Sequence, residues 1–297
     1  MAILKIQQVE KSYGKIKALK GVSFDVPEGS VFGILGPNGS GKTTLLSIIL
    51  DVLKADKGDY LWFGEPGSPE IRKQIGSLLE TPNFYHYLSA VNNLRITQSI
   101  NERGNEEDIA AVLKKVKLFE RRNNRFSTYS LGMKQRLAVG AALLGSPRIL
   151  VLDEPTNGLD PVGIAEMREL IKELHQQGFT IIMASHLLDE VEKVCTHVAI
   201  LKTGELVTHG QVDEILVDED IIEVGAADVH QLAEALASLH GHNKIIKDGQ
   251  LLHIYYNKGE AKPEQINSFC FKHGITLYHL VHRKQRLEAK FFELTGN

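Results

Sequence analysis

One nine-residue segment limits the folds open to this chain more than any other feature of its sequence. The segment GPNGSGKTT occupies residues 36–44 and fits the pattern G-x-x-x-x-G-K-[ST]. It follows a short apolar run at 31–35 and precedes residues 43–53, whose apolar spacing predicts a helix. A strand, this loop and then a helix form the context in which the pattern cradles phosphate. We therefore expect a P-loop nucleotide-binding fold.

The residue types of this loop suit a nucleoside triphosphate. Glycines let the backbone curl so that its N–H groups converge on phosphate oxygens, and the start of the following helix adds a favourable field. Lys42, which we also count as catalytic, supplies a cation for the β- and γ-phosphates, and the Thr43 hydroxyl is a ligand for Mg²⁺. We expect ATP and Mg²⁺ as cofactors, and nucleotide contacts from Gly36, Pro37, Asn38, Gly39, Ser40, Gly41, Lys42, Thr43 and Thr44.

Two further apolar runs end in residues suited to hydrolysis. The run at 149–152 ends in Asp153 and Glu154, and His186 follows the run at 180–184. Asp153 is placed to hold Mg²⁺, and Glu154 could act as the general base for an attacking water. If the two strands are neighbours, His186 reaches the γ-phosphate and stabilises its developing charge. An acidic pair after a strand is often only a helix cap, and a lone histidine is often structural, so both roles depend on the P-loop in the same sheet.

The order of the patterns predicts an α/β fold. Continuous apolar runs suit strands buried on both faces of a parallel sheet, and strands here alternate with helices. Residues of about 85–145 look mostly helical, as if a helical subdomain were inserted between strands. We expect an ATPase domain over 1–217 and a small α+β accessory domain of ferredoxin-like type over 218–297. For the accessory domain we expect strands at 221–224 and 275–281, a hairpin over 244–256, and helices at 229–239, 263–273 and 286–294.

Composition narrows the choice of partners. The net charge of −3 gives no reason to expect a nucleic-acid partner. No stretch approaches the roughly 20 apolar residues that span a bilayer, and the N-terminus MAILKIQQVE lacks the pattern of a signal peptide. Cys195 and Cys270 match no metal or redox spacing and indicate the reduced thiols of a cytosolic protein. We expect no direct membrane span, so a membrane role requires a partner.

Residues 127–160 resemble one family. They read STYSLGMKQRLAVGAALLGSPRILVLDEPTNGLD, which is similar to the signature motif, Walker B strand and D-loop of ABC ATPases in the same order and spacing. The similarity extends from about residue 3 to about residue 216. The resemblance implies an ATP-hydrolysing subunit of an ABC transporter, cytoplasmic and peripheral on the inner face of the cell membrane. It also implies integral membrane permease subunits and a second ATP-binding subunit as partners, in a homodimer or a heterodimer of paralogues.

The resemblance implies roles for four more residues. Tyr13 is similar to the aromatic residue that stacks on adenine, although an ordinary half-buried tyrosine is the alternative. Ser130 and Gly132 match the signature residues that contact the γ-phosphate held by another subunit, and Asp160 matches the D-loop aspartate at the dimer interface. The signature reads YSLGM where the family usually has LSGGQ, and this difference puts the geometry of the site in doubt.

Glu80 stands where the family's Q-loop has glutamine. A carboxylate binds Mg²⁺ more strongly than an amide, so we count Glu80 among the metal ligands. This glutamate resembles the branch of bacitracin-resistance and lantibiotic-immunity exporters, which implies export of a peptide antibiotic, drug or other amphipathic compound. The alternative is a simple substitution without a change of cargo.

Two further segments bear on the partners. In the family, the region after the Q-loop meets a coupling helix of the membrane subunit. Here this region contains Pro82, Phe84, Tyr85, Tyr87 and Leu88. Each of these residues could equally belong to the core of the helical subdomain. The C-terminal stretch 286–297 resembles the tail of exporter-type ATPases. Regulation, dimer stabilisation and structural capping are all open for it.

Two other functions are compatible with a P-loop. A soluble ABC ATPase acting on ribosomes or DNA usually carries two nucleotide-binding units or a long coiled-coil insertion. This chain has each phosphate motif once and shows no such insertion. A non-hydrolytic binding module is disfavoured because Lys42, Asp153, Glu154 and His186 are all present.

Overall fold

A computed structural model describes residues 1–79, 83–215, 219–257 and 259–284. The chain divides into two compact units, a first unit of Met1–Val212 and a second unit of Asp213–Asn297. The boundary expected between residues 217 and 218 lies five residues after the boundary that the structure shows, which falls between Val212 and Asp213. No helix in the described part has the length and apolar character needed to cross a bilayer.

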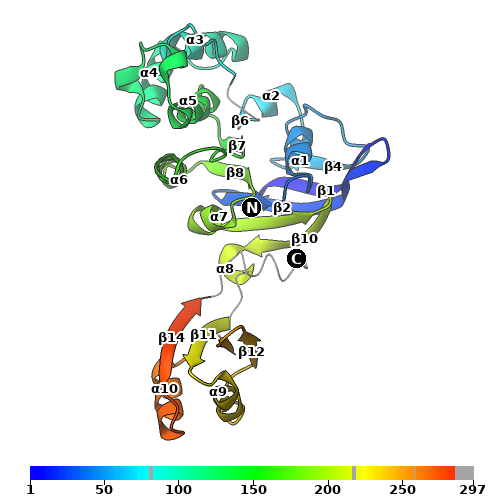
Figure 1. The fold of residues 1–297 in the computed structure, drawn as a ribbon. Helices are drawn as coiled ribbons and strands as arrows, with labels where there is room; N and C mark the ends of the chain where they lie inside the picture. The colour runs from blue at the N-terminus through cyan, green and yellow to red at the C-terminus, as the bar shows by residue number, and fades with distance from the viewer. Residues whose placement is uncertain (80–82, 216–218, 258, 285–297) are drawn as a thin grey trace. The chain divides into compact units, whose positions relative to one another are not determined.

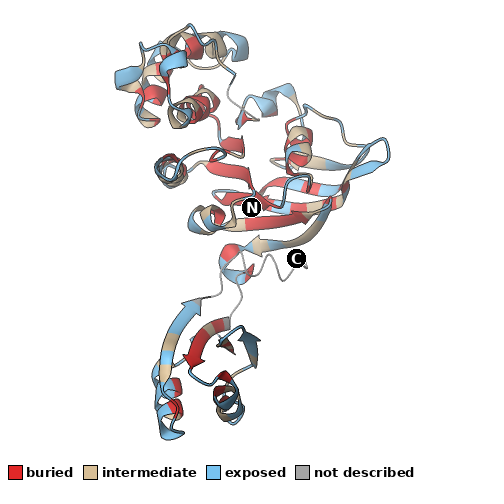
Figure 2. Ribbon diagram, viewed as in Figure 1, coloured by how far each residue is buried: buried red, intermediate tan, exposed pale blue. Residues whose placement is uncertain are grey.

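A six-stranded sheet forms the centre of the first unit (Figure 1). Its strands lie in the order β10-β9-β3-β8-β7-β6, and all neighbours are parallel except β10 and β9. Every residue of β3 is buried, as expected for a strand covered on both faces. The same holds for β7 and β8 (Figure 2). The strands are β3 (Val31–Leu35), β6 (Ile75–Leu78), β7 (Ile149–Asp153), β8 (Thr180–Ser185), β9 (His197–Lys202) and β10 (Glu205–Gln211).

The register of this sheet brings the polar strand ends together. Asp153 at the end of β7 pairs with Ala184 of β8, and Ser185 at the end of β8 pairs with Leu35, the last residue before the P-loop. The expectation that the strand before His186 neighbours the strand ending at Asp153 is confirmed. The loops that follow β3, β7 and β8 therefore begin side by side at the carboxyl ends of the strands.

A second, antiparallel sheet packs against helix α1 (Lys42–Ile49). Its strands lie in the order β2-β1-β4-β5. The helix was expected to continue to residue 53, and this was wrong. Asp51 adopts φ 62°, which cannot continue a right-handed helix, and the Ile49 carbonyl accepts the Trp62 indole N–H at 2.8 Å. The strands are β1 (Ala2–Tyr13), β2 (Ile16–Pro27), β4 (Lys57–Trp62) and β5 (Glu65–Pro66).

Three helices between β6 and β7 form the helical subdomain, and they fall within the expected range of 85–145 (Figure 1). They are α3 (Ala90–Asn101), α4 (Glu106–Lys115) and α5 (Leu131–Leu143). Helix α5 packs closely on β6, because a Cβ on Gly76 would lie 2.0 Å from the Ala142 carbonyl oxygen. The remaining helices are α2 (Pro69–Arg72), α6 (Pro161–Gln176), α7 (Leu188–Val194) and α8 (Val212–Ile215), with 3₁₀ turns at Phe119–Arg121 and Phe126–Thr128.

The second unit has the ferredoxin-like topology expected from the sequence. Its elements follow the order strand, helix, strand, strand, helix, strand, and its antiparallel sheet has the order β12-β13-β11-β14. Ile222 and Val224 point into a core that includes Leu232 and Cys270 of the two helices. The helix expected at 286–294 lies outside the described residues. The elements are β11 (Glu219–Ala226), α9 (Val229–Leu236), β12 (Lys244–Asp248), β13 (Leu251–Asn257), α10 (Pro263–Lys272) and β14 (Leu277–Lys284).

Candidate active site

The P-loop curls around the side chain of its own lysine. Lys42 is the first residue of α1, and its side chain is only 6% exposed. Its Nζ donates to the carbonyl of Gly36 at 2.8 Å and to that of Pro37 at 3.3 Å. These carbonyls hold the ammonium at the base of the loop, at the N-terminal end of a helix whose dipole favours anions.

Two glycines of the loop differ in what surrounds them. Gly41 has φ 104°, and a Cβ there would lie 2.6 Å from the Ala18 carbonyl oxygen and 2.8 Å from Leu19 Cδ2. Gly39 has φ 80°, but a Cβ there would meet no protein atom within 4 Å. The protein itself therefore fills the space beside Gly41, whereas the space beside Gly39 is open to a ligand.

This difference predicts unequal losses of stability. In the absence of nucleotide, Gly41→Ala should lower the free energy of unfolding by about 3 kcal/mol, since it adds a backbone clash to an unfavourable φ. Gly39→Ala should cost only about 1 kcal/mol, for its φ alone. Urea unfolding followed by circular dichroism measures both. Equal losses for the two variants would contradict the packing described for Gly41.

Five polar side chains meet where the loops leave the sheet. The Thr43 hydroxyl donates to Asp153 Oδ2 at 2.7 Å. Lys42 Nζ lies 3.4 Å from Glu154 Oε1, and His186 Nδ1 lies 2.8 Å from Glu154 Oε2. The carboxylate of Glu154 thus bridges the P-loop lysine and the histidine after β8. The structure brings together all five residues that the sequence proposed for metal binding and hydrolysis in these three loops.

The backbone at Glu154 is unusual. Its φ of 48° lies in the left-handed region that residues with side chains rarely adopt. Its N–H donates to the Ala184 carbonyl at 3.1 Å, which anchors it to the end of β8. Such a conformation costs about 1–3 kcal/mol and persists where neighbouring structure enforces it. Here it turns the Glu154 side chain towards Lys42 and His186.

The oxygen donors of this site fit a magnesium ion. Thr43 supplies a hydroxyl and Asp153 a carboxylate, and hard oxygen ligands are those that Mg²⁺ prefers. Among the described residues, no group of three His, Cys, Asp or Glu side chains is arranged to hold a metal. A magnesium ion at Thr43 and Asp153 would therefore complete its coordination with phosphate oxygens and water, as Mg²⁺ commonly does.

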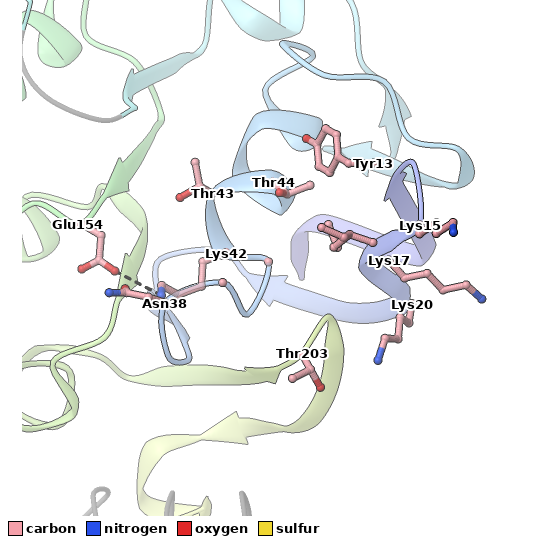
Figure 3. A pocket seen from close by; sticks show the side chains of 14 residues that line it. Tyr13, Lys15, Lys17, Lys20, Asn38, Lys42, Thr43, Thr44, Glu154 and Thr203 are labelled. Carbon is pink, nitrogen blue, oxygen red and sulfur yellow. Dashed lines mark ion pairs between the residues drawn. The ribbon is translucent and has the colours of Figure 1, made fainter.

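A cavity of about 800 Å³ extends from this cluster to the β1–β2 hairpin. Tyr13, which is 51% exposed, lies beside Thr44, while Glu154 and Lys42 lie at the other end (Figure 3). Lys11 Nζ is 6.0 Å from the centre of the Tyr13 ring. The cavity thus offers an aromatic ring at one end and a buried cation at the other, which is the arrangement that a nucleoside triphosphate requires.

Several residues that line this cavity were missed from the sequence. They come from the β1–β2 hairpin and from the turn between β9 and β10. No local motif marks them, because β2 and β10 approach one another only in the folded chain, where the Lys20 N–H donates to the Gly204 carbonyl at 2.9 Å. The missed lining residues are Lys15, Ile16, Lys17, Ala18, Lys20 and Thr203.

Six of the expected nucleotide contacts do not line this cavity. Gly36, Pro37 and Ser40 lie in the P-loop itself, whereas Ser130, Gly132 and Asp160 lie in other segments. Ser130 caps α5, its hydroxyl accepting the Met133 N–H at 3.3 Å, and Asp160 caps α6, its Oδ1 accepting the Gly163 N–H at 2.7 Å. A Cβ on Gly132 would lie 3.8 Å from Gly163 Cα, so the two helix starts adjoin one another. Within one chain Ser130 and Asp160 therefore act as helix caps, and Gly132 lies in the first turn of α5.

The aromatic residues after the Q-loop position do not all point the same way: one packs inside the helical subdomain and two are exposed. Phe84 packs edge-on against Phe126, with ring centres 5.2 Å apart, and so contributes to the helical subdomain. Tyr85 and Tyr87 are 50% and 69% exposed. The buried Asn93 side chain fixes this segment, since its Oδ1 accepts the Tyr85 N–H at 2.8 Å. Pro82 of this segment, and Glu80, which was expected as a metal ligand, lie outside the described residues.

Comparisons of the sequence with known proteins also point to a nucleotide-binding protein. The family model described as ABC transporter matches residues 19–157. The chain is 34% identical to the bacitracin transport ATP-binding protein BcrA of Bacillus licheniformis, with 99% of this chain and 97% of that protein covered. It is 38% identical to the lantibiotic transport ATP-binding protein SrtF of Streptococcus pyogenes, with 71% of this chain and 92% of that protein covered.

Solved structures resemble the chain over a similar extent. A nucleotide-free ATP-binding cassette from an ABC transporter matches with a TM-score of 0.67 and 28% identity, covering 72% of this chain and 93% of that one. A dimeric, post-hydrolysis cassette bound to ADP and Pi matches with a TM-score of 0.62 and 28% identity, covering 71% of this chain and 99% of that one. The chain therefore shares its nucleotide-binding fold with proteins of one functional class.

Proposed function

The chain belongs to the ABC transporter family of ATP-binding proteins, and from this membership we propose that two such subunits close around two Mg-ATP molecules to drive export of an amphipathic compound. It is an ATP-binding and ATP-hydrolysing transporter subunit. The observation that carries the finer proposal is the contact of Glu154 with both Lys42 and His186.

The residues of the site divide the work of hydrolysis. ATP places its phosphates along the P-loop, from Gly36 to Thr44, and its adenine against Tyr13. The phosphate oxygens compete with Glu154 for Lys42, which leaves the carboxylate to accept a proton from water as the water oxygen attacks the γ-phosphorus. His186 donates a hydrogen bond to the developing charge. Thr43 and Asp153, with Glu80 as a further ligand, would hold a magnesium ion, whose charge would offset that of the phosphates.

A second subunit completes each site. Ser130 and Gly132 begin α5, a helix of 13 residues whose N-terminus favours an anion, and Asp160 begins the adjoining α6. We place this surface against the γ-phosphate bound to the partner subunit, which is a second copy or a paralogue. The solved dimeric cassette bound to ADP and Pi supports such an arrangement.

The names of two relatives support the class of cargo. BcrA is named for bacitracin transport and SrtF for lantibiotic transport, and both compounds are peptide antibiotics. We propose a peptide antibiotic, drug or similar amphipathic compound as the cargo of this chain. Integral membrane permease subunits carry it, docked near Tyr85, Tyr87 and Leu88, with the ATPase on the inner face of the cell membrane.

Affinity purification of the Glu154→Gln variant from native membranes with ATP present tests this function. The variant should hold the closed, ATP-bound state, so we expect a multi-spanning membrane protein to be recovered with it. The same purification without ATP is the control. Recovery of ribosomes or nucleic acid in place of a membrane protein would favour the alternative, a soluble ABC ATPase.

A further inference from the structure

Leu131 is an exposed apolar residue at the start of helix α5. It is the first residue of the helix, directly after the capping Ser130, and it is 47% exposed. A Cβ on Gly158 would lie 3.2 Å from Leu131 Cδ2, and no other atom of the described structure, apart from the chain neighbours of Gly158, would lie within 4 Å of it. The side chain of Leu131 therefore lies over the Cα of Gly158, in the space that a side chain at position 158 would take.

Gly158 belongs to the loop that carries Glu154. The Glu154 carbonyl accepts the Asn157 N–H at 3.0 Å, and the Thr156 carbonyl accepts the Leu159 N–H at 3.3 Å. Gly158 is the third residue of the second of these turns, and its φ of 73° is a left-handed value that favours glycine there. Because the two turns overlap, a displacement of Gly158 is passed along the backbone to Glu154.

The ends of this loop are fixed, whereas its middle is exposed. The Glu154 N–H is bonded to the end of β8, and Asp160 caps α6. Asn157 and Gly158, which lie between these two anchors, are exposed. Leu131 covers this exposed turn from the side of the helical subdomain. The conformation of the turn therefore depends on a side chain that belongs to α5.

We propose that Leu131 is a positioning residue for ATP hydrolysis, which packs on Gly158, holds the turn after Glu154 in one conformation and so directs the Glu154 carboxylate. This inference rests on the proposed role of Glu154 as the base. Hydrolysis is sensitive to such placement, because a shift of about 1 Å in a reacting group can lower a rate by about 100-fold. The glycine that is usual in the family at position 131 has no side chain with which to make this contact.

Amide hydrogen exchange of the full-length chain without nucleotide tests the contact in the absence of any partner nucleotide. Leu131→Ala should raise the exchange rates of the Asn157 and Leu159 amides about tenfold, because both N–H groups close the turns that Leu131 covers. Leu131→Met should keep the wild-type rates, since methionine retains an apolar side chain of similar volume. Ile100→Ala, at a 73% exposed residue of the same subdomain, should also keep them. Equal exchange in wild type and Leu131→Ala would overturn the inference.

Steady-state hydrolysis shows whether the contact serves the reaction. Leu131→Ala should lower kcat about tenfold and change KM less than about twofold, because the base is displaced while the P-loop that binds ATP is untouched. Leu131→Met should keep kcat within about twofold of wild type. A kcat for Leu131→Ala equal to that of wild type would show that the contact has no part in hydrolysis.

A double-mutant cycle assigns the effect to Gly158. Gly158→Ala should lower kcat about tenfold in the wild-type chain, where its methyl group meets Leu131, but only about twofold in the Leu131→Ala chain, where that space is free. The strain of a positive φ is common to both backgrounds and cancels. Effects that simply multiply would place Leu131 against the nucleotide of the partner subunit and overturn this inference, while leaving Glu154 as the base. A Glu154→Gln variant with a near wild-type rate would overturn both.

Discussion

Glu154→Gln should lower the rate of ATP hydrolysis by about 10²–10⁴-fold while leaving ATP binding intact, because glutamine cannot accept the proton of the attacking water. The amide keeps the size of the side chain and a contact with His186, which lies 2.8 Å from the carboxylate. The backbone at position 154 also keeps its hydrogen bond to Ala184. The change therefore removes the base without removing the fold around it.

Phosphate release measures the rate, and equilibrium binding of a fluorescent ATP analogue measures the affinity. Glu205→Gln is a matched control, because Glu205 also pairs with a lysine, Lys20 at 3.0 Å, but its side chain is 63% exposed. Its rate should stay within about twofold of wild type. A Glu154→Gln variant that hydrolyses ATP at near the wild-type rate would remove Glu154 from the role of base.

Lys42→Met should weaken ATP binding by about 100-fold, since it deletes a buried charge that faces the phosphates and keeps only an apolar stem. Lys42 is 6% exposed and is held by two carbonyls of the loop, so no water-exposed cation can take its place. The variant also leaves Glu154 without the lysine that lies 3.4 Å from it. Isothermal titration with ATP gives the affinity directly.

Lys15→Met is the control for this second result. Lys15 lines the same cavity but is exposed at the end away from Glu154 (Figure 3). Its loss should change the affinity less than about threefold, because exposed charges are screened by water and salt. Similar losses for the two variants would mean that the cavity attracts ATP by its summed charge and not through one buried lysine.

The placement of these site residues was predictable from the sequence, because each of them belongs to a short local motif. The loop at 36–44 and the acidic pair at 153–154 each follow a run of buried residues, and a parallel sheet aligns such strand ends. His186 required one assumption about neighbouring strands, and the register confirmed it. Motifs of this kind depend on neighbouring residues in the sequence and can therefore be recognised without knowledge of the fold.

Features that depend on distant contacts were not predictable. The end of α1 is decided by Asp51 and by the indole of Trp62, which lies on another strand. The hairpin lysines and Thr203 join the cavity only through contacts between β2 and β10. None of these carries a periodicity or a motif.

The helical subdomain joins the central sheet next to the strand that carries the catalytic carboxylates. The subdomain departs from the end of β6, where Leu78 lies opposite Leu152, the residue before Asp153. Neighbouring strands are about 4.8 Å apart, so this pivot lies one strand from the carboxylates. A force applied to the outer surface of α3 would act across the length of the subdomain and arrive beside Glu154. Any coupling between the helical subdomain and the hydrolytic site would therefore have to cross only one pair of neighbouring strands.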